Sequence, residues 1–162
     1  MEPNPRVKIL KKTGIEDFEG SSEKISGPVL YWMNREIRTD DNWSLYFAQD
    51  LAKDSGVPLV VVYNLVPGFL GGQNRHLTFK VDGLKEVESN LNEKNIPFHL
   101  IVDKDALDAE NPGNSAEQIL KLVEKIDAGA LVTDFYPLNL PKKWNQEILE
   151  NIKIPFYEVD SH

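Results

Sequence analysis

Three short segments contain the residues of this sequence that could do chemistry. Residues 34–43 mix charged, amide and aromatic side chains, residues 134–138 combine a carboxylate with two aromatic rings, and Asp103 follows an apolar run. A carboxylate beside two rings could hold a flat ligand. The alternative interpretation is a solvated loop, a helix cap and turn-forming aspartates, with Trp43 packed in the core.

The common catalytic motifs are missing. The sequence contains no G-x-G-x-x-G, no G-x-x-x-x-G-K-[ST] and no G-x-S-x-G, so neither a phosphate-binding loop nor a nucleophile elbow is supported. His76, His99 and His162 share no metal-ligand spacing. The absence of cysteine excludes disulfides, zinc–cysteine sites and thiol catalysis. We therefore expect no catalytic residue and no metal site in this chain.

Length and charge further narrow the range of functions that the chain could have. The 162 residues suit one domain, and 41% apolar content is enough for a core. With 26 acidic and 18 basic residues the net charge is -8, which disfavours nucleic-acid binding by this chain alone because phosphate contacts need cations. No apolar run approaches the ~18 residues of a membrane span. Residues 1–27 lack an apolar signal-peptide centre, so we expect a cytoplasmic protein without a membrane partner.

The candidate segments must be positioned by the elements around them. Residues 1–27 form a charged, extended leader that prolines and glycines interrupt. In it, Val7, Ile9 and Leu10 could anchor a short helical turn. From residue 28 onward, apolar runs of strand length alternate with amphipathic helical patterns. The expected strands cover residues 29–33, 57–63, 97–102, 130–133 and 154–159. Continuous β-branched runs suit strands covered on both faces. The sequence therefore predicts a doubly wound, five-stranded parallel α/β sheet of Rossmann-like form over residues 28–162.

Several local details follow from the same pattern. Ser115 and Gln118 suit a capping box, and Pro141 suits the first turn of the last helix. Gly129 stands where a helix should end. In an open parallel sheet, ligands bind outside the carboxyl ends of the strands. We therefore expect any site in the loops at residues 34–41, 64–74, 103–114 and 134–141.

Ordered motifs in these loops resemble the class II cyclobutane pyrimidine dimer photolyases. They are Val29-Leu30-Tyr31-Trp32-Met33-Asn34-Arg35, Asp41-Asn42-Trp43, Arg75-His76, Gly83-Leu84-Lys85-Glu86-Val87, Val132-Thr133-Asp134-Phe135-Tyr136-Pro137-Leu138, Trp144 and Pro155-Phe156-Tyr157-Glu158-Val159-Asp160-Ser161-His162. The resemblance is strongest at residues 132–138, where the family usually has Ser in place of Tyr136. It extends from about residue 6 to residue 162.

The resemblance implies the N-terminal α/β domain of a DNA photolyase. In that family the FAD, the electron-transfer tryptophans and the dimer-binding cleft belong to a helical domain that follows. This chain alone would then bind no FAD and be inactive, and it would meet UV-damaged DNA only through the helical flavin domain. The whole protein would be a deoxyribodipyrimidine photolyase, a carbon–carbon lyase.

Some photolyases hold an antenna pigment, often 8-hydroxy-5-deazaflavin, at the strand ends of this domain. The resemblance carries this site over, by position, to Met33, Arg35, Asn42, Trp43, Asp103, Asp134 and Phe135. The sequence departs from the family at Val102, where the family often has Gly, and in a longer acidic insertion over residues 105–110.

Other interpretations remain open. The chain could be a stand-alone α/β protein that binds a nucleotide-like small molecule, or a photolyase-like domain that serves only as an interaction module. A domain that packs against a larger partner should expose an apolar patch. The expected patch consists of Trp32, Met33, Phe135, Leu138 and Tyr157. We expect the isolated chain to cover it by forming a symmetric homodimer.

Overall fold

A computed structural model describes residues 4–11, 25–67, 74–103 and 113–162. The acidic insertion at residues 105–110 and much of the leader lie outside these ranges. The described elements, in chain order, are β1 (Val7–Lys11), β2 (Val29–Trp32), α1 (Trp43–Ser55), β3 (Leu59–Leu65), α2 (Asn74–Glu93), β4 (Phe98–Val102), α3 (Ser115–Lys125), β5 (Ala130–Asp134), α4 (Asn139–Asn151) and β6 (Phe156–Val159).

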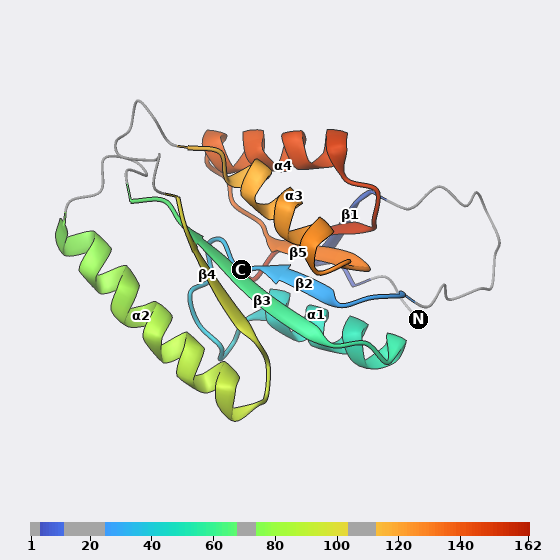
Figure 1. Cartoon of the computed structure of the whole chain (residues 1–162), viewed down its shortest axis with the longest axis horizontal. Helices are drawn as coiled ribbons and strands as arrows, with labels where there is room; N and C mark the ends of the chain where they lie inside the picture. The colour runs from blue at the N-terminus through green and yellow to red at the C-terminus, as the bar shows by residue number, and fades with distance from the viewer. Residues whose placement is uncertain (1–3, 12–24, 68–73, 104–112) are drawn as a thin grey trace.

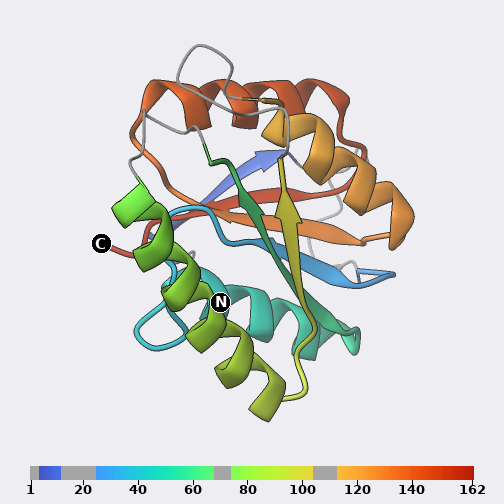
Figure 2. The same ribbon diagram turned by 60° about the vertical axis from the view of Figure 1, so that its left-hand side comes forward.

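The sheet is the middle of three layers. Helices α1 and α2 cover one of its faces and α3 and α4 cover the other (Figures 1 and 2). The strand order is β1-β6-β5-β2-β3-β4, and every neighbouring pair among β2 to β6 is parallel. The predicted doubly wound α/β class is therefore confirmed. Among the described residues, none of the helices combines the length and the hydropathy needed to cross a membrane.

The strand count of the prediction is wrong, because the leader contributes a sixth strand. Strand β1 pairs antiparallel with β6, with Val7 opposite Val159 and Ile9 opposite Tyr157. The expected short helical turn at this place is therefore wrong as well. Strand β1 lies at the edge of the sheet, where only one neighbour supplies hydrogen bonds, and its lysines keep contact with solvent. Such a strand lacks the apolar run that marks the central ones.

Two apolar cores lie on the two faces of the sheet. The first packs β2, β3 and β5 against α1 and α2, and the second packs the same strands against α3 and α4. Trp32 belongs to the second core and Met33 to the first, with 1% and 0% of their surfaces exposed. The expected apolar patch is therefore wrong in these two residues, because β2 is covered on both faces. Of the rest, only Leu138 counts as exposed.

The helix termini differ in detail from the expectation. Asn114, not Ser115, caps α3: its Oδ1 accepts from the N–H of Glu117 at 3.0 Å. Ser115 instead accepts a 2.7 Å hydrogen bond from Asn64 Nδ2 in the interior, which explains why it does not cap. Pro141 lies buried in the first turn of α4, as predicted.

Candidate functional site

The candidate site lies where the strand order reverses. From β2 the chain continues to β3 and β4 on one side of the sheet, whereas β5 and β6 lie on the other side. The carboxyl ends of β2 and β5 are therefore neighbours at the topological switch point, where open α/β sheets bind ligands. The first segment, residues 34–43, follows β2, and the second begins with Asp134 at the end of β5.

Asp134 organises the loop that follows β2. Its side chain is almost fully buried, and its Oδ2 accepts hydrogen bonds from the backbone N–H groups of Asn34, Arg35 and Glu36 at 2.9, 2.9 and 3.1 Å. Its Oδ1 accepts from the hydroxyl of Tyr31 at 2.7 Å. Successive N–H groups that converge on one carboxylate form an anion nest. This nest is filled by the protein's own side chain, so Asp134 shapes the loop.

Asn42 and Tyr31 extend this network to helix α1. Asn42 is fully buried, and its Oδ1 caps the helix by accepting from the N–H of Leu45 at 2.9 Å. Its Nδ2 donates to Tyr31 Oη at 3.1 Å and to the backbone oxygen of Arg38 at 2.9 Å. Burial, followed by the charge of Asp134, raises the pKa of Tyr31 well above its ordinary value. The phenol therefore stays neutral and donates a hydrogen bond to the Asp134 carboxylate.

Glu36 is a buried charge that the sequence analysis missed. Only 7% of its side chain is exposed. Its Oε2 lies 3.0 Å from Arg38 Nη2, and its Oε1 lies 3.0 Å from Nε2 of His162. The segment looks like a solvated loop in the sequence, and one of the two partners at 3.0 Å, His162, is 126 residues away along the chain. The sequence therefore does not mark Glu36 as buried.

The accessible rim of the site consists of Arg35, Phe135 and Tyr136. Arg35 has a third of its side chain exposed, and both aromatic residues are half-buried. Burial raises the pKa of Tyr136, and the nearby charge of Arg35 partly offsets this. Tyr63 lies close enough for Tyr136 to add to the rise of its pKa, which burial mainly causes. The rim therefore offers one cation, one aromatic ring without polar atoms and one neutral phenol.

Trp43 is not in the core, contrary to the alternative interpretation above. Helix α1 buries Leu45 and Ala48 instead, and 41% of Trp43 remains exposed. Its ring contacts Tyr46 edge-on at 6.0 Å and carries the guanidinium of Arg6 4.9 Å above its centroid. This stacking is a cation–π contact. It places Trp43 beside β1 and not beside Asp134.

Met33 and Asp103 are two other candidate residues, and each makes contacts that do not belong to this network. Met33 is fully buried, and its N–H donates to the backbone oxygen of Val62 at 2.9 Å. Asp103 is 3% exposed at the end of β4, two strands away from β2, and accepts from the N–H of Asn114 at 3.1 Å. The structure therefore brings Arg35, Asn42 and Asp134 into one network, and places Met33, Trp43 and Asp103 outside it.

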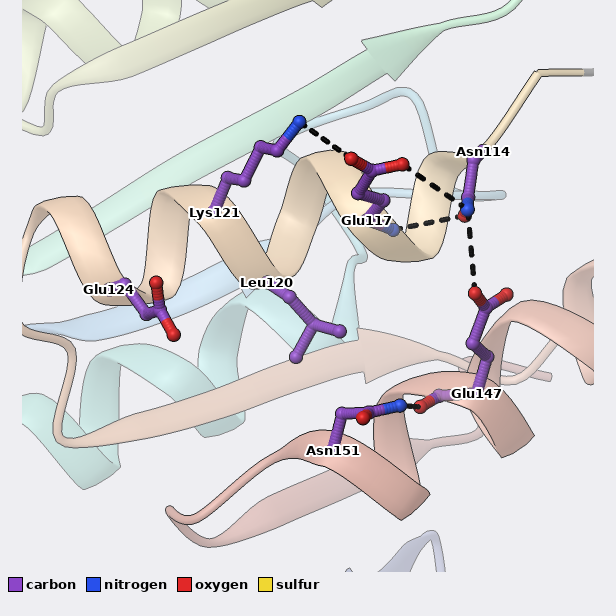
Figure 3. A pocket seen from close by; sticks show the side chains of 7 residues that line it. All are labelled: Asn114, Glu117, Leu120, Lys121, Glu124, Glu147 and Asn151. Carbon is purple, nitrogen blue, oxygen red and sulfur yellow. Dashed lines mark hydrogen bonds and ion pairs between the residues drawn. The ribbon is translucent and has the colours of Figure 1, made fainter.

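A polar groove of about 320 Å³ lies on the opposite face of the sheet, between α3 and α4 (Figure 3). Its lining residues are Asn114, Glu117, Leu120, Lys121, Glu124, Glu147 and Asn151. Lys121 pairs with Glu117 at 2.7 Å, and Asn114 bridges toward Glu147 at 3.4 Å. None of the seven candidate residues lines this groove. Within the described ranges, no group of three His, Asp or Glu side chains could hold a metal ion.

Fold and site together define an α/β domain with a hydrogen-bonded network at its topological switch point. Its strand ends present one cation and neutral aromatic rings, and the two carboxylates of the switch point are occupied by internal partners. A family model described as DNA photolyase matches residues 29–162, so the chain belongs to the DNA photolyase family.

Curated relatives agree with this assignment. The chain is 33% identical to a deoxyribodipyrimidine photo-lyase of Arabidopsis thaliana over 159 residues, which are 97% of this chain and 29% of the relative. It is 36% identical to the enzyme of the same name from Potorous tridactylus over 82% of this chain and 24% of the relative. The chain therefore spans less than a third of the length of either relative.

Solved structures support the fold. A bacterial class III photolyase from Agrobacterium tumefaciens superimposes with a TM-score of 0.59 at 19% identity, over 86% of this chain and 27% of that one. A universal stress protein from Archaeoglobus fulgidus in complex with dAMP superimposes with a TM-score of 0.53 at 19% identity, over 83% of this chain and 98% of that one. At this identity both likenesses concern the fold alone.

Proposed function

We propose that the chain is the N-terminal, antenna-type domain of a class II deoxyribodipyrimidine photolyase. The whole protein uses light to split cyclobutane pyrimidine dimers by electron donation from reduced flavin. The observation that carries this proposal is the family match over residues 29–162, which includes both the loop after β2 and the loop after β5. The fraction of the relatives covered, 24% and 29%, suits one domain of a larger enzyme.

In this proposal the chemistry is divided between two parts of the enzyme. FAD and the damaged DNA belong to the helical flavin domain, the partner of this chain. The net charge of -8 supports this division, because a surface that binds DNA phosphates needs a surplus of Lys and Arg.

The site at the switch point is assigned to an antenna pigment of the 8-hydroxy-5-deazaflavin type. Energy transfer requires a fixed distance and orientation but no proton transfer, and the described site offers no exposed acid–base pair. Arg35 would meet the anionic edge of the pigment, and Phe135 and Tyr136 would pack against its rings. Asp134 and Asn42 would hold the loop that presents Arg35, through the hydrogen bonds described above. Met33, Trp43 and Asp103 would support the surrounding elements.

A fluorescence titration with 8-hydroxy-5-deazaflavin tests the pigment site. We expect a micromolar Kd, about -8 kcal/mol, because a partly exposed rim buries only part of the ligand. Arg35→Ala and Phe135→Ala should each weaken binding about tenfold, since each removes one contact of roughly 1.4 kcal/mol.

The matched control is Lys121→Ala, which removes a cation from the groove on the opposite face of the sheet and should leave the Kd unchanged. If the pigment binds equally well to both rim variants, the placement of the site is wrong. If the wild-type chain does not bind at all, the antenna assignment fails, while membership of the family stands.

A further inference from the structure

The three residues that follow β6 are fastened to the start of the described chain. The N–H of Asp160 donates to the backbone oxygen of Arg6 at 2.9 Å. The Arg6 guanidinium in turn donates to the backbone oxygens of Asp160 at 3.5 Å and of His162 at 2.9 Å. Because Arg6 also stacks on Trp43, its guanidinium is fixed from two sides. We call residues 160–162, together with Arg6 and Glu36, the exit clasp.

A second arm of the exit clasp comes from the candidate site. The Glu36 carboxylate lies 3.0 Å from Nε2 of His162, and the N–H of Glu36 donates to Asp134. A buried carboxylate is costly unless charged or hydrogen-bonding groups face it. Arg38 and the His162 imidazole each supply such a group at 3.0 Å, and Nε of Arg35 supplies a third, more distant one at 4.0 Å. The imidazole is therefore held by a carboxylate that the loop after β2 keeps in place.

We infer that Glu36 is a positioning residue that fixes the direction in which the chain leaves β6. It does so by holding the His162 side chain, while Arg6 holds the backbone of the same segment. Glu36 is adjacent to Arg35 in a loop whose N–H groups converge on one carboxylate. Through Glu36, the direction of the chain after β6 therefore depends on the loop after β2, which contributes Arg35 to the rim of the site.

This inference rests on the proposed function in one respect: the exit direction has a consequence only in a polypeptide that continues beyond His162 into a partner domain. The contacts of the exit clasp belong to the chain itself. They can be tested without pigment, flavin or DNA, so a failed clasp and a failed antenna assignment give different results.

Backbone nitrogen-15 relaxation measures the order of the exit clasp directly. In the wild type we expect order parameters near 0.85 for the amides of Ser161 and His162, the value of a rigid backbone. Glu36→Ala should lower both below about 0.6, the range of flexible segments. His162→Ala, which changes a half-exposed side chain and does not endanger folding, should lower the value of Ser161 in the same way.

Two further variants separate positioning from a general loss of structure. Glu36→Gln keeps an oxygen acceptor at the same place. It should therefore recover at least half of the fall in the order parameters of Ser161 and His162 that Glu36→Ala causes. Arg38→Ala removes the other close partner of Glu36 and should leave Ser161 and His162 rigid. Unchanged order parameters in Glu36→Ala would show that the other contacts of the segment, from Arg6 and Ser44, hold it without Glu36. A general fall across β6 would show that Glu36 acts only on overall folding, and either result overturns the inference.

Discussion

At the residue scale, Asp134 joins β5 to the loop after β2, because its carboxylate accepts hydrogen bonds from three backbone N–H groups of that loop and from the Tyr31 hydroxyl. We predict that Asp134→Ala lowers the free energy of unfolding by about 3 kcal/mol, because hydrogen bonds to a charged group contribute about 1.5–3 kcal/mol each and the loop can regain part of the loss from water. Urea denaturation measures the change.

The matched control for this prediction is Asp82→Ala on α2. Asp82 is an exposed aspartate whose one described ion pair, with Lys85, spans 3.7 Å. Its removal should change the stability by less than about 0.5 kcal/mol, as for most exposed ion pairs. An Asp134→Ala protein within 1 kcal/mol of the wild type would contradict the assigned role.

The residue types of the site could be predicted from the sequence, but their roles could not. The resemblance to the photolyases predicts Asp134, Asn42 and Arg35 as site residues, and the structure joins them in one network. The sequence suggested a ligand-facing Asp134, whereas its partners are backbone N–H groups about a hundred residues away. Every residue except proline has a backbone N–H group, so the residue types do not show which of these groups will donate to a side chain. Glu36 is hidden for a related reason, since one of its ion partners, His162, lies 126 residues away along the chain.

At the scale of elements, the central strands were predictable and the edge was not. Strands β2, β3 and β5 are buried on both faces, and their continuous apolar runs report this directly. Strand β1 mixes two lysines with three apolar residues and pairs with β6, more than 140 residues later. A strand that depends on a distant partner is recognisable only after the sheet has been assembled.

The contact between the start of β2 and the turn before β5 gives a prediction at this scale. The N–H of Gly129 donates to the backbone oxygen of Pro28 at 2.8 Å, and a Cβ on Gly129 would lie 2.7 Å from the oxygen of Ser26 and 2.8 Å from that of Gly27. These are backbone atoms, which cannot rotate away. Gly129→Ala should therefore destabilise the protein by about 2 kcal/mol, the usual cost of overpacking.

Gly83→Ala is the control, and it should have the opposite sign. Gly83 lies inside α2, and its added Cβ would meet only the Ile37 side chain at an ordinary 3.6 Å. Alanine in a helix interior is favoured over glycine by about 0.8–1.0 kcal/mol, so this variant should be more stable than the wild type. Thermal unfolding of the two variants side by side decides the matter. Equal midpoints would show that the turn before β5 can move aside.

At the scale of the whole molecule, the two surface features of the described chain bear on the proposed function. The groove between α3 and α4 is lined almost entirely by polar and charged side chains, whereas pockets for flat cofactors are mostly apolar. At the switch point, a third of the Arg35 side chain is exposed. Both features suit a domain that presents a ligand to a partner better than one that encloses a reaction.

We therefore predict that the purified chain of 162 residues neither retains flavin nor repairs DNA by itself. Its visible absorption spectrum should lack flavin bands after expression, and blue light should leave cyclobutane dimers intact even when reduced FAD is added. The net charge of -8 should also keep the chain from retaining UV-irradiated duplex at physiological salt, where DNA binding relies on Lys and Arg contacts to phosphate. A full-length photolyase handled in parallel is the positive control. Flavin recovered at close to one molecule per chain would show that residues 1–162 contain a reaction centre, and would overturn the division of chemistry proposed above.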